Sequence, residues 1–142
     1  MDTELFELCK EVYKRTGWEL EDGILVDYRF GGTYKNDFMN KKLSVWKKQL
    51  EEYKEAYKVS DAKASEQFAF APLYTSDYLL EKLPKTRMDS DYNGNWNMGI
   101  QWHSEEKGWN YFVGAFNGYG DTPLKALLKL SIALDNAKEL NK

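Results

Sequence analysis

The stretch NWNMGIQWHSEEKGWNYFVGAF, residues 95–116, decides the fold expected for this chain of 142 residues. Apolar side chains recur at every second position of its first nine residues, which is the period of an extended strand with one covered face. These side chains are Trp96, Met98, Ile100 and Trp102. A charged turn at 104–108 leads to a second strand at 109–116, which carries apolar residues on both faces. The pattern predicts an aromatic β-hairpin in a sheet that is covered on both sides.

One long helix is expected after this hairpin. Thr122 is placed to cap its first turn, and Pro123 suits the first helical position. Leucines then recur at helical spacing from Leu124 to Leu134 and form an apolar stripe. We expect this stripe to pack on the hairpin.

Shorter elements complete the predicted fold. In chain order they are a helix from Asp2 or Thr3 to Thr16, a strand at 24–30, an extended segment at 68–72 and a short helix at 78–83. Residues 59–67 are interpreted as a polar linker and residues 85–94 as a loop. The whole pattern predicts a single α+β domain over residues 1–142, with an antiparallel sheet centred on the aromatic hairpin (about 95–116) between helical layers.

A charged helix is predicted between Asn36 and Ser60, with apolar residues spaced alternately four and three apart. This heptad seam consists of Met39, Leu43, Trp46, Leu50, Tyr53 and Tyr57. Two interpretations stay open: the seam covers the protein's own sheet, or it contacts a partner helix. Because the stripe is narrow, we predict a homodimer that is anchored by Trp46 and Tyr53.

Composition limits the classes of partner. The net charge is −3 and the pI is near 5.3, whereas direct nucleic-acid binding usually requires a strongly basic face. The single cysteine, Cys9, excludes an intramolecular disulfide and favours a reducing compartment. The sequence shows neither a signal peptide nor an apolar run that could span a membrane. We therefore expect a cytoplasmic protein that binds neither nucleic acid nor membranes.

Catalytic patterns are scarce. His103 is the single histidine, so a metal centre with several histidine ligands is excluded, and no Gly-x-Ser-x-Gly elbow or P-loop occurs. Residues 89–94 match the first half of a calcium loop, but the twelfth position is Ile100 in place of the closing glutamate. We predict no catalytic residue, no metal site and no cofactor, and a small hydrolase is the least favoured function.

Two of the three arginines are candidates for a ligand site. Arg29, near a strand end, and Arg87, before the hairpin, could converge on an anion while an aromatic ring stacks on a base. Tyr92 and Trp109 are the aromatic candidates. The alternative is that these arginines are solvated or paired for structural reasons.

Several of these motifs together resemble the phage ABA-sandwich family of small phage and prophage proteins. The similar pieces are Thr16-Gly17-Trp18, Tyr74-Thr75-Ser76-Asp77, the Trp-rich hairpin, and the Asp121-Thr122-Pro123 helix start that continues to Leu128. The resemblance covers about residues 5–20 and 70–140, so the heptad helix at about 37–58 is interpreted as an insertion.

The resemblance implies a sheet between helical layers and a phage origin, but it supplies no catalytic motif. We therefore expect a non-catalytic phage accessory protein in the cytoplasm of an infected bacterium, which inhibits a host antiviral defence protein. The alternative is a small-molecule binder that sequesters a nucleotide immune signal.

Overall fold

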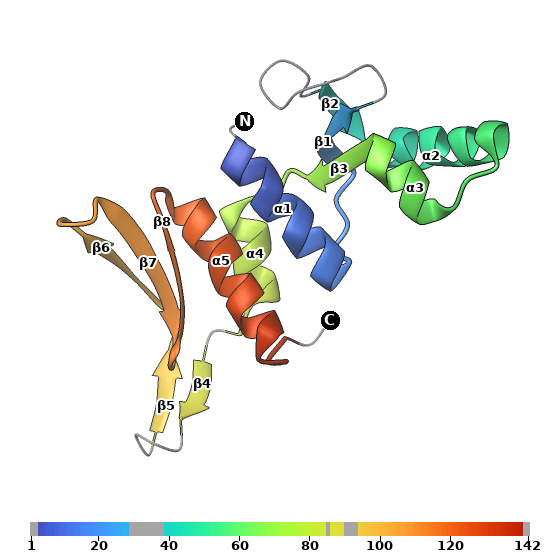
Figure 1. Cartoon of the computed structure of the whole chain (residues 1–142). Coiled ribbons are helices and arrows are strands. Elements are labelled where there is room, and N and C mark those ends of the chain that lie inside the picture. Colours follow the sequence, from blue (N-terminus) through green and yellow to red (C-terminus); the bar gives the residue numbers. More distant parts are fainter. Residues whose placement is uncertain (1–2, 29–38, 85, 90–93, 141–142) are drawn as a thin grey trace. The chain divides into compact units, whose positions relative to one another are not determined.

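The fold is described from a computed structural model (Figure 1). It describes residues 3–28, 39–84, 86–89 and 94–140, and of residues 86–89 and 94–96 the backbone alone. The predicted α+β class is confirmed, because helices accompany antiparallel sheets throughout these residues. No helix in the described part of the chain combines the length and the hydrophobicity of a membrane span.

Contacts divide the chain into two compact units, which are described separately. Unit 1 comprises Met1–Lys14 and Trp18–Leu73, and unit 2 comprises Arg15–Gly17 and Tyr74–Lys142. That the whole chain forms a single domain stays a prediction.

Unit 1 is built on a three-stranded antiparallel sheet in the order β2-β1-β3. The strands are β1 (Asp22–Asp27), β2 (Met39–Lys42) and β3 (Phe68–Pro72), and the helices are α1 (Thr3–Thr16, whose last two residues belong to unit 2), α2 (Leu43–Tyr57) and α3 (Asp61–Gln67). Strand β1 is central, so β3 has one open edge. Pro72 suits this edge, because proline has no N–H to donate to a neighbouring strand.

Two segments of unit 1 differ from the sequence prediction. The first residues of the predicted 36–60 helix form β2, which pairs with β1, so this segment is built into the sheet. Helix α2 begins where Glu21 accepts hydrogen bonds from the backbone N and the Oγ of Ser44. The predicted linker at 59–67 contains α3, whose first turn is capped by Ser60 Oγ accepting from Lys63 N at 3.3 Å.

Unit 2 contains a three-stranded antiparallel sheet in the order β6-β7-β8 and a two-stranded sheet of β4 and β5. Its elements are α4 (Ser76–Lys82), β4 (Thr86–Asp89), β5 (Gly94–Asn97), β6 (Gly99–His103), β7 (Gly108–Val113), β8 (Phe116–Gly120) and α5 (Pro123–Asn136). Helix α5 packs on β8 and β7, and α4 packs on α5 (Figure 1). Thr122 Oγ1 accepts from Lys125 N at 3.2 Å, and Pro123 is the first helical residue, as predicted.

The predicted aromatic hairpin is correct where β6 pairs with β7 and wrong at both ends. The expected strand 109–116 ends at Val113, and Phe116 is the first residue of β8. The expected strand 95–103 is divided at Met98: β5 pairs with β4, where a loop was expected, and β6 pairs with β7. The segment with Gly118 and Gly120, for which no element was predicted, belongs to strand β8. A Cβ at Gly118 would overlap the backbone of Leu130 and Ala126, so glycine permits the close approach of α5.

Candidate functional site

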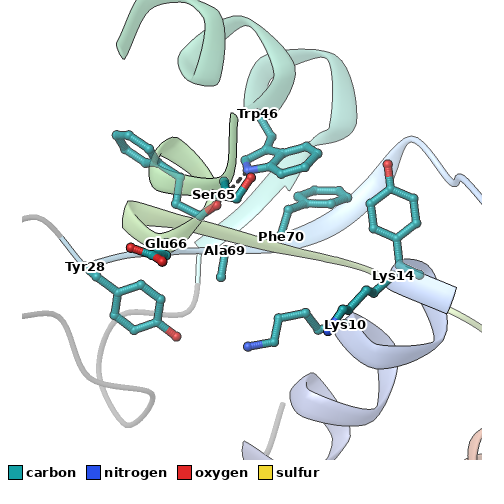
Figure 2. A pocket seen from close by; sticks show the side chains of 11 residues that line it. Lys10, Lys14, Tyr28, Trp46, Ser65, Glu66, Ala69 and Phe70 are labelled. Carbon is teal, nitrogen blue, oxygen red and sulfur yellow. Dashed lines mark hydrogen bonds between the residues drawn. The ribbon is translucent and has the colours of Figure 1, made fainter. Parts of the chain in front are cut away.

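A groove runs along the open edge of strand β3 in unit 1 (Figure 2). Its volume is about 660 Å³, which lies in the range of small-molecule sites. The residues that line it are Lys10, Tyr13 and Lys14 of α1, Tyr28 after β1, Trp46 of α2, Ala62, Ser65 and Glu66 of α3, and Phe68, Ala69 and Phe70 of β3.

Aromatic rings form one wall of the groove. Trp46 stacks on Phe70, with ring centroids 5.1 Å apart and planes inclined by 19°. The Trp46 indole also donates from Nε1 to the Phe68 carbonyl at 3.0 Å. Tyr13 meets both stacked rings edge-on, with centroids 6.3 Å away in each case. The indole is therefore held in one orientation beside the edge of β3.

Local sequence patterns explain this wall. Strand β3 alternates phenylalanine and alanine, so Phe68 and Phe70 share one face while Ala69 lies on the other. On α2, Trp46 and Tyr53 are seven residues apart and therefore lie on one side of the helix. Tyr53 meets Phe68 edge-on at 5.3 Å, whereas Trp46 stacks on Phe70. Helix and strand thus interlock through two ring pairs.

Lysines of α1 provide the positive charge of the groove. Lys10 pairs with Glu7 of the same helix at 3.1 Å and extends below β3 toward Tyr28 (Figure 2). Lys14 is exposed and has no ion-pair partner among the residues that the structure describes. Glu66 of α3 is the acidic group of the lining. The groove therefore offers an uncommitted cation, Lys14, near an aromatic wall.

Tyr13 is held in place by a hydrogen bond to a carboxylate that is itself fixed by an ion pair. Burial raises the pKa of its hydroxyl above the ordinary value of 10.0, and the neighbouring Glu19 carboxylate, which accepts its hydrogen bond, raises that pKa further. Lys47 Nζ lies 2.8 Å from Glu19 Oε2, and this pairing fixes the carboxylate. Tyr13 is therefore a neutral hydrogen-bond donor at neutral pH.

The heptad seam serves unit 1 itself over much of its length. Leu43 is buried, and the two residues predicted to anchor a partner, Trp46 and Tyr53, pack on the rings of β3 instead. The physical reason is that Phe68 and Phe70 share one face of β3 and offer a ring to each of the two rings that share one side of α2. Leu50 is partly buried, and Met39 and Tyr57 expose 37% and 66% of their surface. The homodimer stays a prediction.

Of the four residues predicted to bind a ligand, Trp109 alone has a described side chain, and it does not line this groove. Arg29 and Tyr92 lie outside the described residues, and of Arg87 only the backbone is described, paired with Trp96 in β4 and β5. Trp109 belongs to unit 2, on β7, where its ring is tilted against Trp102 at 5.0 Å. Most of the half calcium loop at 89–94 also lies outside the described residues.

The single histidine lies at the end of β6. His103 Nδ1 is 3.4 Å from Glu106 Oε2, and its ring meets Tyr119 edge-on at 5.9 Å. Its Nε2 is buried and, within the described part of the chain, has no hydrogen-bond partner. Among those same residues, no group of three or more His, Cys, Asp or Glu side chains is arranged to hold a metal ion.

Sequence reasoning missed the groove because one of its walls, α3, was interpreted as a polar linker. Ser60 followed by Asp61 is a helix-start signal that would have revealed α3. The Phe-Ala alternation of β3 already indicated a strand with one aromatic face. Nothing in the sequence reveals which strand lies at the sheet edge, since strand order is a tertiary property. No family model, no curated protein and no solved structure matches this chain, so its resemblance to the phage ABA-sandwich family stays a prediction.

Proposed function

We propose that this protein is a non-catalytic binding protein and that its groove takes a small planar molecule with an anionic group, of the nucleotide class. The observation that carries this proposal is that the Trp46–Phe70 stack and the uncommitted Lys14 line the same groove of about 660 Å³. An aromatic ring can stack on any base, because every base has a π-face. A lysine attracts phosphate as a point charge.

The resemblance to phage proteins supplies the biological setting of the proposal. In the cytoplasm of an infected bacterium, a protein that sequesters a nucleotide would deprive a host antiviral defence of its signal. Binding alone accomplishes this, so neither a catalytic residue nor a cofactor is required.

Nucleotide binding can be tested directly. Tryptophan fluorescence is titrated with the four nucleoside 5′-monophosphates and with inorganic phosphate. We expect quenching by at least one nucleotide, loss of that quenching in Trp46→Phe, and weaker binding by Lys14→Gln. Lys48→Gln is the matched control, because Lys48 is an exposed lysine of α2 that does not line the groove. The absence of a response to all four nucleotides refutes the proposal.

A second candidate function, inhibition of a host defence protein by direct contact, is favoured by two exposed side chains of unit 2. Ile100 and Trp102 on strand β6 expose 42% and 47% of their surface, and exposed tryptophans often anchor protein interfaces. In a pull-down from infected host lysate, a partner retained by the wild type should be lost with Trp102→Ala and kept with Trp46→Phe. Equal capture by both variants refutes a contact through β6.

A further inference from the structure

Among the residues that the structure describes, Phe70 of β3 has a main-chain donor and a main-chain acceptor without a partner, at the edge that faces the groove. Antiparallel pairs alternate between hydrogen-bonded and non-hydrogen-bonded positions. Tyr28 N donates to Gln67 O at 2.8 Å, and Leu73 N donates to Asp22 O at 2.9 Å, which fixes the alternation at both ends of the β1–β3 pair. With Leu25 opposite Phe70 in the register, Phe70 occupies a non-hydrogen-bonded position. Its N–H and C=O therefore point away from β1, toward the open edge.

Phe68 and Pro72 are the other residues of β3 whose main chain faces outward, and their main-chain donors are already used or missing. Phe68 donates its N–H to Ala64 O, and its carbonyl accepts from Trp46 Nε1. Pro72 has no N–H. Phe70 is 3% exposed, and among the described residues neither its N–H nor its C=O has a hydrogen-bond partner. Buried backbone groups are rarely left unpaired, so a partner other than the described residues is expected here.

The single free residue favours a small molecule over an added peptide strand. A strand that extends a sheet edge bonds to every second residue along it. Here Phe68 is occupied and Pro72 lacks a donor, so Phe70 alone offers both a donor and an acceptor to an added strand. One donor beside one acceptor instead matches the edge of a nucleobase, on which a hydrogen-bond acceptor and a donor are neighbours.

We infer that the Phe70 main chain reads the edge of a nucleobase, with its N–H donating to a base acceptor and its C=O accepting from a base donor, while Lys14 faces the phosphate. This inference rests on the proposed function and specifies how that site recognises its ligand. Because main-chain groups do the reading, side-chain substitutions at Phe70 leave the donor and the acceptor in place.

The test follows backbone amide signals of the ¹⁵N-labelled full chain during titration with the four nucleoside 5′-monophosphates and with ribose 5-phosphate. A nucleotide that quenches Trp46 should move the Phe70 amide proton downfield. The Ala69 amide is the control, because the same alternation places it in the β1–β3 ladder opposite Val26, where its signal should move far less. Ribose 5-phosphate, which has no base, should leave Phe70 unchanged.

Each other outcome has a definite meaning. Quenching of Trp46 by a nucleotide without movement of the Phe70 amide overturns the base-edge inference, leaves the proposed function standing and assigns the Phe70 groups to water. Equal movement with ribose 5-phosphate also overturns it, since the base is then not read. No binding of any nucleotide overturns the proposed function and this inference together.

Discussion

Trp46 of α2 and Phe70 of β3 stack with their ring centroids 5.1 Å apart and their planes inclined by 19°, although 24 positions separate them in the sequence. The indole is tied to the same strand by its hydrogen bond to the Phe68 carbonyl. This one side chain therefore joins helix to sheet in unit 1 and also forms the groove wall. Its substitution should affect both stability and binding.

Trp46→Ala is expected to lower the free energy of unfolding by about 3 kcal/mol, the lower end of the range for truncating a large aromatic residue, because Trp46 is only partly buried. Urea unfolding followed by circular dichroism measures this loss. Trp46→Phe keeps a ring against Phe70 and loses only the indole hydrogen bond, so its cost should be about 1 kcal/mol. Equal costs for both variants would show that the stack contributes little.

Gly118→Ala should destabilise unit 2 by about 3 kcal/mol or more, since the added Cβ would overlap backbone atoms of α5 that cannot rotate away. Chemical unfolding measures the loss. Asn117→Ala is the neighbouring control, because Asn117 is exposed on the same strand and its truncation should change stability by less than about 0.5 kcal/mol. A mild Gly118→Ala variant would contradict the close contact between β8 and α5.

Acid should weaken the link between Glu21 and the start of α2. Hydrogen bonds from the Ser44 hydroxyl and backbone lower the pKa of Glu21 below its ordinary value of 4.5. A carboxylate whose pKa is lower in the folded state than in the unfolded state stabilises the fold at pH values above its unfolded-state pKa. This contribution is lost as the pH falls through the folded-state pKa. The contribution should therefore begin to decline below about pH 4.5.

The measurement for Glu21 is a carboxyl ¹³C NMR titration of wild type and Ser44→Ala. In the variant the pKa should rise toward 4.5, because the hydroxyl donor, the largest cause of the shift, is gone. Ser65→Ala, an exposed serine of α3 that does not contact Glu21, should leave the titration unchanged. An identical Glu21 titration in wild type and Ser44→Ala would refute this link.

Self-association is predicted through the heptad seam, of which unit 1 leaves Tyr57 exposed and Leu50 only partly buried. Sedimentation equilibrium should show a dimer for wild type, and Tyr57→Glu should dissociate it, since a charge would be buried at the contact. Lys48→Glu, which lies off the seam, is the control. A monomeric wild type, or a Leu50→Glu variant that unfolds instead of dissociating, would mean that the seam is intramolecular core.

The sequence by itself determined the elements whose signals are local. Thr122 and Pro123 marked the start of α5 because a cap and a fixed φ act within one helical turn. The alternation of Phe68, Ala69 and Phe70 indicated an extended strand for the same reason, and 3.6-residue periodicity indicated α1 and α2.

Only the tertiary structure decided how these elements are paired. Strand pairing placed β3 at a sheet edge and divided the predicted strand 95–103 between two sheets. It also paired the Gly118 segment with β7, as a strand on which α5 packs. It also gave Trp46 a partner within its own unit, a choice that the heptad pattern left open. Periodicity reports which face of an element is apolar, whereas the partner of that face depends on segments distant in sequence. The groove arises from such pairings, and so does the unsatisfied main chain of Phe70.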